Sequence, residues 1–153
     1  MNSEKDPVTS IMIVDDHPIV ANGIQQLIDR EPDMKVINSV QDADSAVKCM
    51  DRSAPDLIIV DISLKGSTNG IDLIKGLKKR YPKIKALVLS MHDENLYAER
   101  AIKAGAKGYI MKNDLTDNII RANLMAESES AAIDSPAAPY AKLILGLVST
   151  NAI

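Results

Sequence analysis

Acidic side chains follow two apolar runs of this sequence, at the points where strands are expected to end. Asp15 and Asp16 come directly after Ile11–Val14, and Asp61 follows Leu57–Val60. Ligands of open α/β sheets bind outside the carboxyl ends of the strands, so carboxylates placed there are well sited for chemistry. The alternative is that each aspartate only caps a helix or forms a turn.

A hydroxyl and an ammonium group end two further apolar runs. Ser90 ends residues 86–90, and Lys112 ends residues 108–112. Taken singly, Ser90 is typical of a turn and Lys112 of a solvated surface. Because the carboxyl ends of parallel strands meet at one edge of a sheet, these groups can converge with the aspartates. Their joint appearance at successive strand ends favours one site.

Convergence of these groups predicts phosphoryl chemistry. Three carboxylates within a few ångströms repel one another unless a cation is present, and all-oxygen ligation suits Mg²⁺. The nucleophile would be the Asp61 carboxylate, which is charged at neutral pH and needs no general base. Phosphoryl transfer needs mainly positioning and charge neutralisation. Mg²⁺ and Lys112 would supply positive charge, and Ser90 would donate a hydrogen bond.

The elements that must position these groups alternate along the chain. Five strands are expected, at residues 11–14, 36–40, 57–60, 86–90 and 108–112. Five helices are expected, at about residues 18–30, 43–50, 71–80, 94–104 and 115–120. Such alternation implies an α/β fold: a doubly wound parallel sheet with right-handed crossovers and helices on both faces.

The composition of the 153 residues, with 46% hydrophobic and 25% charged, is ordinary for one globular domain. A net charge of −3 gives no basic field that would attract DNA to this chain by itself. A single cysteine, Cys49, excludes an internal disulfide. With no signal-peptide pattern and no run long enough for a membrane span, we expect a cytoplasmic protein without membrane contact.

Three segments are expected: a polar tail at residues 1–8, the folded domain at 9–126, and a tail at 127–153. Residues 127–139 are rich in Ser, Ala and Pro, which is typical of a linker. Residues 141–153 are apolar and carry few charges. They are a stub of a further helix, an interface segment or sequence foreign to the natural protein, and these alternatives stay open.

Residues 8–126 resemble a two-component response regulator receiver domain. The resemblance rests on four stretches: Val14-Asp15-Asp16-His17, Ile59-Val60-Asp61-Ile62-Ser63, Leu89-Ser90-Met91-His92 and Ala104–Lys112. It implies a flavodoxin-like, doubly wound sheet of five parallel strands in the order 2-1-3-4-5, with five helices. It also implies that Asp61 is the phospho-acceptor.

The resemblance implies a role for each residue near the acceptor. Asp16 and Asp61 would bind Mg²⁺ directly, Asp15 would act through a bound water, and the Ser63 backbone carbonyl would complete the protein ligands. Lys112 corresponds to the lysine of the family pattern. By the same resemblance Ser90 and Tyr109 are the switch pair, and positions 63 and 92 (Ser63 and His92) tune the lifetime of the acyl phosphate.

The resemblance further implies a sensor histidine kinase as phosphoryl donor, and a signalling domain rather than an enzyme. The motifs are similar to those of receivers joined to a LuxR-type helix-turn-helix, which bind DNA, commonly as dimers. No such pattern occurs in residues 127–153, so DNA contact would need an output domain absent here. A homodimer would use the fourth helix, fifth strand and fifth helix, or the first and fifth helices. A stand-alone receiver or phosphorelay intermediate is the alternative.

Three other functions are alternatives to this interpretation, and the sequence departs from the family pattern at three places. A haloacid-dehalogenase-like phosphatase would need a second aspartate at the position of Ser63. A flavodoxin-type nucleotide-binding module would not place Asp15 and Asp16 beside phosphates, which they would repel. A pseudo-receiver that only mediates contacts would not need the acidic residues. Three departures are Lys65 at a frequent proline position, a loop to Gly70 one residue longer, and Asn113 in place of a cis-proline. His17 is expected to begin the first helix rather than to bind metal.

Overall fold

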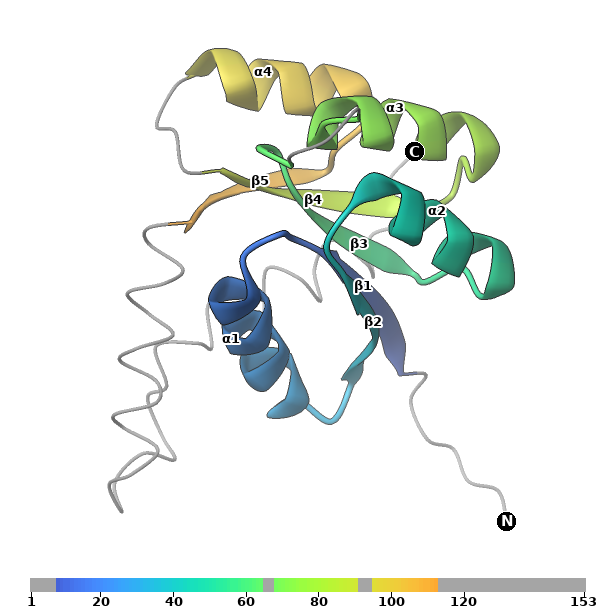
Figure 1. The fold of residues 1–153 in the computed structure, drawn as a ribbon, viewed down its shortest axis with the longest axis vertical. Helices are drawn as coiled ribbons and strands as arrows, with labels where there is room; N and C mark the ends of the chain where they lie inside the picture. The colour runs from blue at the N-terminus through green and yellow to red at the C-terminus, as the bar shows by residue number, and fades with distance from the viewer. Residues whose placement is uncertain (1–7, 65–67, 91–94, 113–153) are drawn as a thin grey trace.

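The computed structural model describes residues 8–64, 68–90 and 95–112. Strands and helices alternate along this part of the chain (Figure 1), in the order β1 (Thr9–Val14), α1 (Pro18–Asp29), β2 (Met34–Val40), α2 (Ala43–Arg52), β3 (Leu57–Asp61), α3 (Gly70–Arg80), β4 (Lys85–Ser90), α4 (Asn95–Ala104) and β5 (Gly108–Met111). All strand pairs are parallel, and the sheet order is β2-β1-β3-β4-β5. The predicted doubly wound sheet and its order are confirmed.

Helices cover both faces of the sheet. In Figure 1, α1 lies on one face, and α2, α3 and α4 lie on the other. Alternating residues of β1 divide between two cores: Ile11 and Ile13 pack with α1, whereas Met12 and Val14 pack with α2 and α3. Because both faces are covered, the central strands are continuous apolar runs and do not alternate between apolar and polar residues. These apolar runs are the pattern from which the strands were predicted.

Local signals set where the helices begin. Asp42 caps α2 by accepting from the Ser45 N–H at 2.7 Å, and Asn69 caps α3 by accepting from the Asp72 N–H at 2.9 Å. Such caps satisfy backbone donors that the first helical turn leaves unpaired. The Asp42 cap was predicted and is confirmed. The fifth predicted helix, around residues 115–120, and the tail at 127–153 lie outside the described residues.

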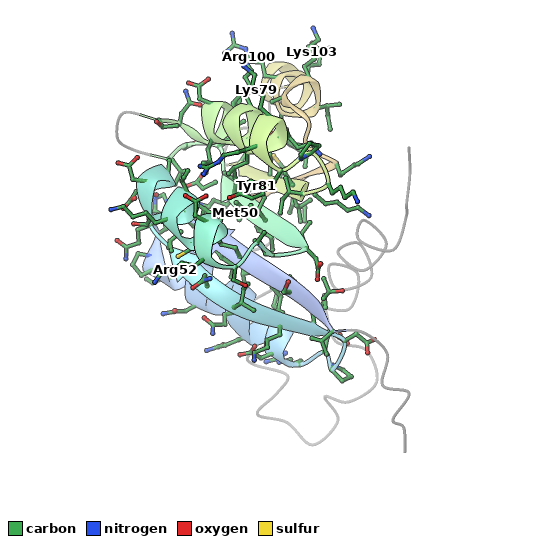
Figure 2. The ribbon with its side chains drawn as sticks, turned by 90° about the vertical axis from the view of Figure 1, so that its right-hand side faces the viewer. Met50, Arg52, Lys79, Tyr81, Arg100 and Lys103 are labelled. Carbon is green, nitrogen blue, oxygen red and sulfur yellow. The ribbon has the colours of Figure 1, made fainter. Side chains whose placement is uncertain are left out.

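Helices α2 and α3 are also tied together away from the carboxyl edge of the sheet. Figure 2 shows Met50 and Tyr81 close together. Met50 belongs to the core cluster on this face of the sheet, and Tyr81 packs against that cluster. The Tyr81 hydroxyl donates to Asp51 Oδ1 at 2.6 Å, and Arg80 pairs with the same oxygen at 2.8 Å.

None of the described helices is both long and apolar enough to cross a membrane.

Candidate functional site

Four polar residues at the carboxyl edge of the sheet are buried: Asp15, Asp61, Ser90 and Lys112. Asp61 and Ser90 are the last residues of β3 and β4, while Asp15 and Lys112 follow β1 and β5 directly. Charged residues are almost never fully buried unless they are paired. Lys112 contacts both Asp15 and Asp61, so the predicted convergence of strand ends is confirmed for these three residues, and Ser90 is buried at the same edge.

The Lys112 ammonium lies between two carboxylates. Its Nζ is 3.0 Å from Asp61 Oδ2, 3.1 Å from Asp15 Oδ1 and 3.0 Å from Asp15 Oδ2. The Lys112 side chain is 1% exposed, and the two aspartate side chains are 0% exposed. Water therefore screens these charges little, and each group depends on the others for its solvation.

Backbone N–H groups orient the same two carboxylates. Asp61 Oδ1 accepts from the Ser63 N–H at 2.9 Å, and Asp15 Oδ1 accepts from the His17 N–H at 2.8 Å. Each carboxylate thus binds a donor two residues further along its own loop, as aspartates do in Asx turns. The Ser63 N–H binds Oδ1 of Asp61 and Lys112 binds Oδ2, so the Asp61 carboxylate is held from both sides.

Asp16 and His17 complete the cluster. Ligand atoms of Asp15, Asp16, His17 and Asp61 all lie within 4.8 Å of one another. His17 is the N-cap residue of α1, as predicted, but its ring also lies among the carboxylates. Nδ1 is 2.9 Å from Asp16 Oδ1, 3.0 Å from Asp15 Oδ1 and 3.5 Å from Asp61 Oδ2. The ring therefore lies among the predicted metal ligands, and the expectation that His17 does not bind metal stays a prediction.

The donor set of this cluster fits a divalent cation. Asp15, Asp16 and Asp61 carry three carboxylates, and Lys112 offers one ammonium in return. The excess of carboxylates favours binding of a cation, and carboxylate oxygens are the ligands that Mg²⁺ prefers in proteins. The predicted metal ligands Asp15, Asp16 and Asp61 are thus brought together, and Ser63 lies beside them.

The pKa of Asp15 is raised above the value of 3.8 of an exposed aspartate, chiefly by burial, and repulsion from Asp61 adds to it. Hydrogen bonds from Lys112 and from the His17 N–H, and the Lys112 charge, act in the opposite direction. Burial disfavours the charged form, so it prevails over the hydrogen bonds. The negative charge of Asp15 is consequently a cost to the metal-free fold.

This raised pKa predicts a pH effect on stability. Because the folded state holds the Asp15 proton to higher pH than the unfolded chain, its stabilising contribution is complete below pH 3.8 and is lost as the pH rises through the raised pKa. Urea unfolding in EDTA between about pH 4 and pH 7 should show the free energy of unfolding of Asp15→Asn rising relative to that of the wild type. A difference between the two proteins that does not change with pH would contradict this assignment.

The remaining predicted residues lie around this centre. The sheet register pairs Asp61 with Leu89, so the buried Ser90 is one residue beyond the position opposite Asp61 on the neighbouring strand. Tyr109 is half-buried in β5, and its hydroxyl donates to Met111 Sδ at 3.5 Å. His92 and the departures at Lys65 and Asn113 lie outside the described residues.

Sequence reasoning missed one residue that shapes the site. Gly70, the first residue of α3, packs so closely on the end of β3 that an added Cβ would lie 2.3 Å from the Asp61 backbone oxygen. It was noted only as the end of a loop. The signal that could have found it is a glycine at a helix start shortly after a strand-end aspartate, because only glycine lets the backbone approach so closely.

Known proteins resemble this chain over the same residues. A family model for the response regulator receiver domain matches residues 11–123. The transcriptional regulatory protein DegU of Brevibacillus brevis is 36% identical over 112 residues, 73% of this chain and 47% of that protein. The Fimbriae Z protein of Salmonella typhimurium is 38% identical over 109 residues, 71% of this chain and 51% of that protein.

A solved structure agrees. The crystal structure of a LuxR-family two-component response regulator from Aurantimonas sp. SI85-9A1 matches with a TM-score of 0.65 at 30% identity, over 88% of this chain and 99% of that one. This chain spans about half the length of the curated relatives that it matches. With the family model covering most of its residues and the strand-end groups converging as described, the chain belongs to the response regulator receiver domain family.

Proposed function

We propose that Asp61 accepts a phosphoryl group from the phosphohistidine of a sensor kinase, in a reaction that needs Mg²⁺. The observation that carries this proposal is the fully buried carboxylate at the end of β3, held by the Ser63 N–H and Lys112 beside Asp15 and Asp16. A carboxylate is charged at neutral pH, so it attacks phosphorus without a general base. The histidine–phosphorus bond breaks as the aspartyl–phosphorus bond forms.

The residues around Asp61 have distinct parts in this proposal. Asp16 and Asp61 hold the metal directly, Asp15 acts through a water, and the Ser63 carbonyl completes the protein ligands. Bound Mg²⁺ supplies positive charge that offsets the carboxylates and the phosphoryl oxygens. The Lys112 ammonium donates to Asp61 Oδ2 and has three N–H groups, so it would be able to donate one of them to a phosphoryl oxygen on Asp61.

The response to phosphorylation is proposed to pass from β4 to β5. The modification adds about −1.5 to −2 charge and strong acceptor oxygens, which Ser90 would bind. Tyr109 pairs with Val88, two residues before Ser90, so a shift at the end of β4 reaches the half-buried ring through the sheet register. Ser63 and His92 would set how fast water reaches the acyl phosphate. Hydrolysis returns the domain to its first state.

The partners follow from the family and from the relatives. A sensor histidine kinase is the donor, and the output in a longer protein is control of transcription, as the name of DegU states for that protein. DNA contact and a homodimer through α4, β5 and the fifth helix, or through α1 and the fifth helix, remain proposals. So do the domain limits at residues 9–126, self-dephosphorylation and the cytoplasmic location. Use as a phosphorelay intermediate is the alternative.

Intact mass after incubation with acetyl phosphate tests the proposal. The wild type with Mg²⁺ should gain one phosphoryl group, and the protein in EDTA should gain none. Asp61→Asn should gain none under either condition, because the amide is not a nucleophile. The matched control is Asp72→Asn, which changes an exposed aspartate of α3 and should leave the adduct unchanged. An adduct that persists in Asp61→Asn would show that the nucleophile is a different residue.

A further inference from the structure

The side chain of His17 makes contacts that the start of a helix does not require. The His17 N–H already donates to Asp15 Oδ1, and its side chain makes no capping hydrogen bond to α1. The ring nevertheless turns toward the carboxylates, although the side chain is 49% exposed and has solvent available. Among the described residues, the carboxylate cluster and Lys112 are what the ring contacts in this orientation.

The Lys112 ammonium lies beside the same ring nitrogen that faces the carboxylates. Nδ1 of His17 lies 3.0 Å from Lys112 Nζ. An ammonium group can only donate and a carboxylate can only accept, so the role of Nδ1 toward Lys112 and toward the carboxylates depends on the tautomer of the ring. The nitrogen faces the space that the carboxylates share. Neutral imidazole binds metal ions through a ring nitrogen that carries no proton.

The distances match those between neighbouring ligands of one ion. With metal–ligand bonds of about 2.1 Å, adjacent atoms of an octahedral shell lie about 3.0 Å apart. Nδ1 is 2.9 Å from Asp16 Oδ1 and 3.0 Å from Asp15 Oδ1, and its distance to Asp61 Oδ2 is 3.5 Å. The nitrogen thus lies at a spacing from the carboxylate oxygens that a shared metal ion would allow.

We propose that His17 Nδ1 is a ligand of the metal ion in the strand-end cluster, which makes the site a mixed nitrogen and oxygen site. This inference rests on the metal site of the proposed function. Imidazole suits first-row transition metals, whereas carboxylate and water suit Mg²⁺. The nitrogen therefore raises affinity for Mn²⁺ and Co²⁺ relative to Mg²⁺ and extends the range of ions that the domain accepts.

Electron spin echo envelope modulation of Mn²⁺ bound to the full chain tests the ligand directly. The chain has two histidines, so His92→Gln with ring-¹⁵N histidine places the label at His17 alone. The unlabelled protein should show ¹⁴N modulation, labelling should convert it to the ¹⁵N pattern, and His17→Ala should remove it. Bound Mn²⁺ without nitrogen modulation would overturn the role of His17 and leave the proposed function intact.

Affinities provide a second, independent measurement. Isothermal titration should show Co²⁺ binding to His17→Ala weakened by at least about tenfold, with Mg²⁺ binding changed by less than about twofold. If the ring instead blocked the site, His17→Ala would bind both ions more tightly, and the inference would be wrong. If Asp61→Asn bound the ions as the wild type does, the metal site itself, and the proposed function with it, would be overturned.

Discussion

Replacing Lys112 with methionine should lower the free energy of unfolding of the metal-free domain by about 3–5 kcal/mol. Methionine keeps most of the volume of the lysine stem but removes its charge. The ammonium now pairs with Asp15 and Asp61, and none of the three side chains is more than 1% exposed. Removing one member of a buried ion pair leaves the other charges without solvation, which costs more than the pair itself contributed.

Urea unfolding in EDTA at pH 7 measures this loss, with Lys79→Met as the matched control. Lys79 lies on α3 with an exposed side chain that points away from the sheet (Figure 2). Its replacement should change stability by less than about 0.5 kcal/mol. Adding Asp15→Asn to Lys112→Met should restore part of the loss, because one uncompensated carboxylate is gone. Equal losses in the single and double variants would contradict the proposed charge balance.

Divalent ions should separate the role of charge from that of packing. If Lys112 stabilises the fold by offsetting carboxylates, saturating Mg²⁺ should raise the stability of Lys112→Met more than that of the wild type. An ion present at about 100 times its dissociation constant contributes about 2.7 kcal/mol. A Mg²⁺ effect of the same size in both proteins would show instead that the methionine disturbs packing around residue 112.

Replacing Gly70 with alanine should destabilise the domain by about 1–3 kcal/mol and slow phosphorylation of Asp61. The added Cβ would lie 2.3 Å from the Asp61 backbone oxygen and 2.8 Å from Ile62 Cα. Both neighbours are backbone atoms of the segment that carries the acceptor, so no side chain can rotate away. The start of α3 or the end of β3 must move, and the Asp61 carboxylate moves with the strand.

Gly76 of the same helix provides the control. Nothing lies within 4 Å of an added Cβ there, so Gly76→Ala should stabilise the domain by about 1 kcal/mol through helix propensity alone. Thermal unfolding and the rate of adduct formation with acetyl phosphate are measured for both variants. Two alanines of opposite effect in one helix would locate the cause at the β3 contact. Stabilisation by both would show that the backbone at residue 70 yields freely.

Much of the fold could be predicted because the pattern of residues is local. The apolar runs 57–60 and 86–90 are strands because both faces of the sheet are covered, which makes every position in them apolar. Asp42 begins α2 because its side chain satisfies a free backbone donor of the first turn. Predicted limits differed mainly at strand ends: β2 begins at Met34, two residues before the predicted start, and β5 ends at Met111.

The pattern of residues was enough to predict which side chains lie at the carboxyl edge of the sheet. Asp15, Asp61, Ser90 and Lys112 each end or follow a strand, and parallel strands must bring their carboxyl ends to one edge. Which of those groups contact one another depends on the tertiary structure. The His17 ring meets Lys112 across 95 residues of chain, and Gly70 lies against Asp61 because α3 packs over the end of β3. Such contacts depend on how whole elements pack, whereas the pattern of residues records only the type and position of each element.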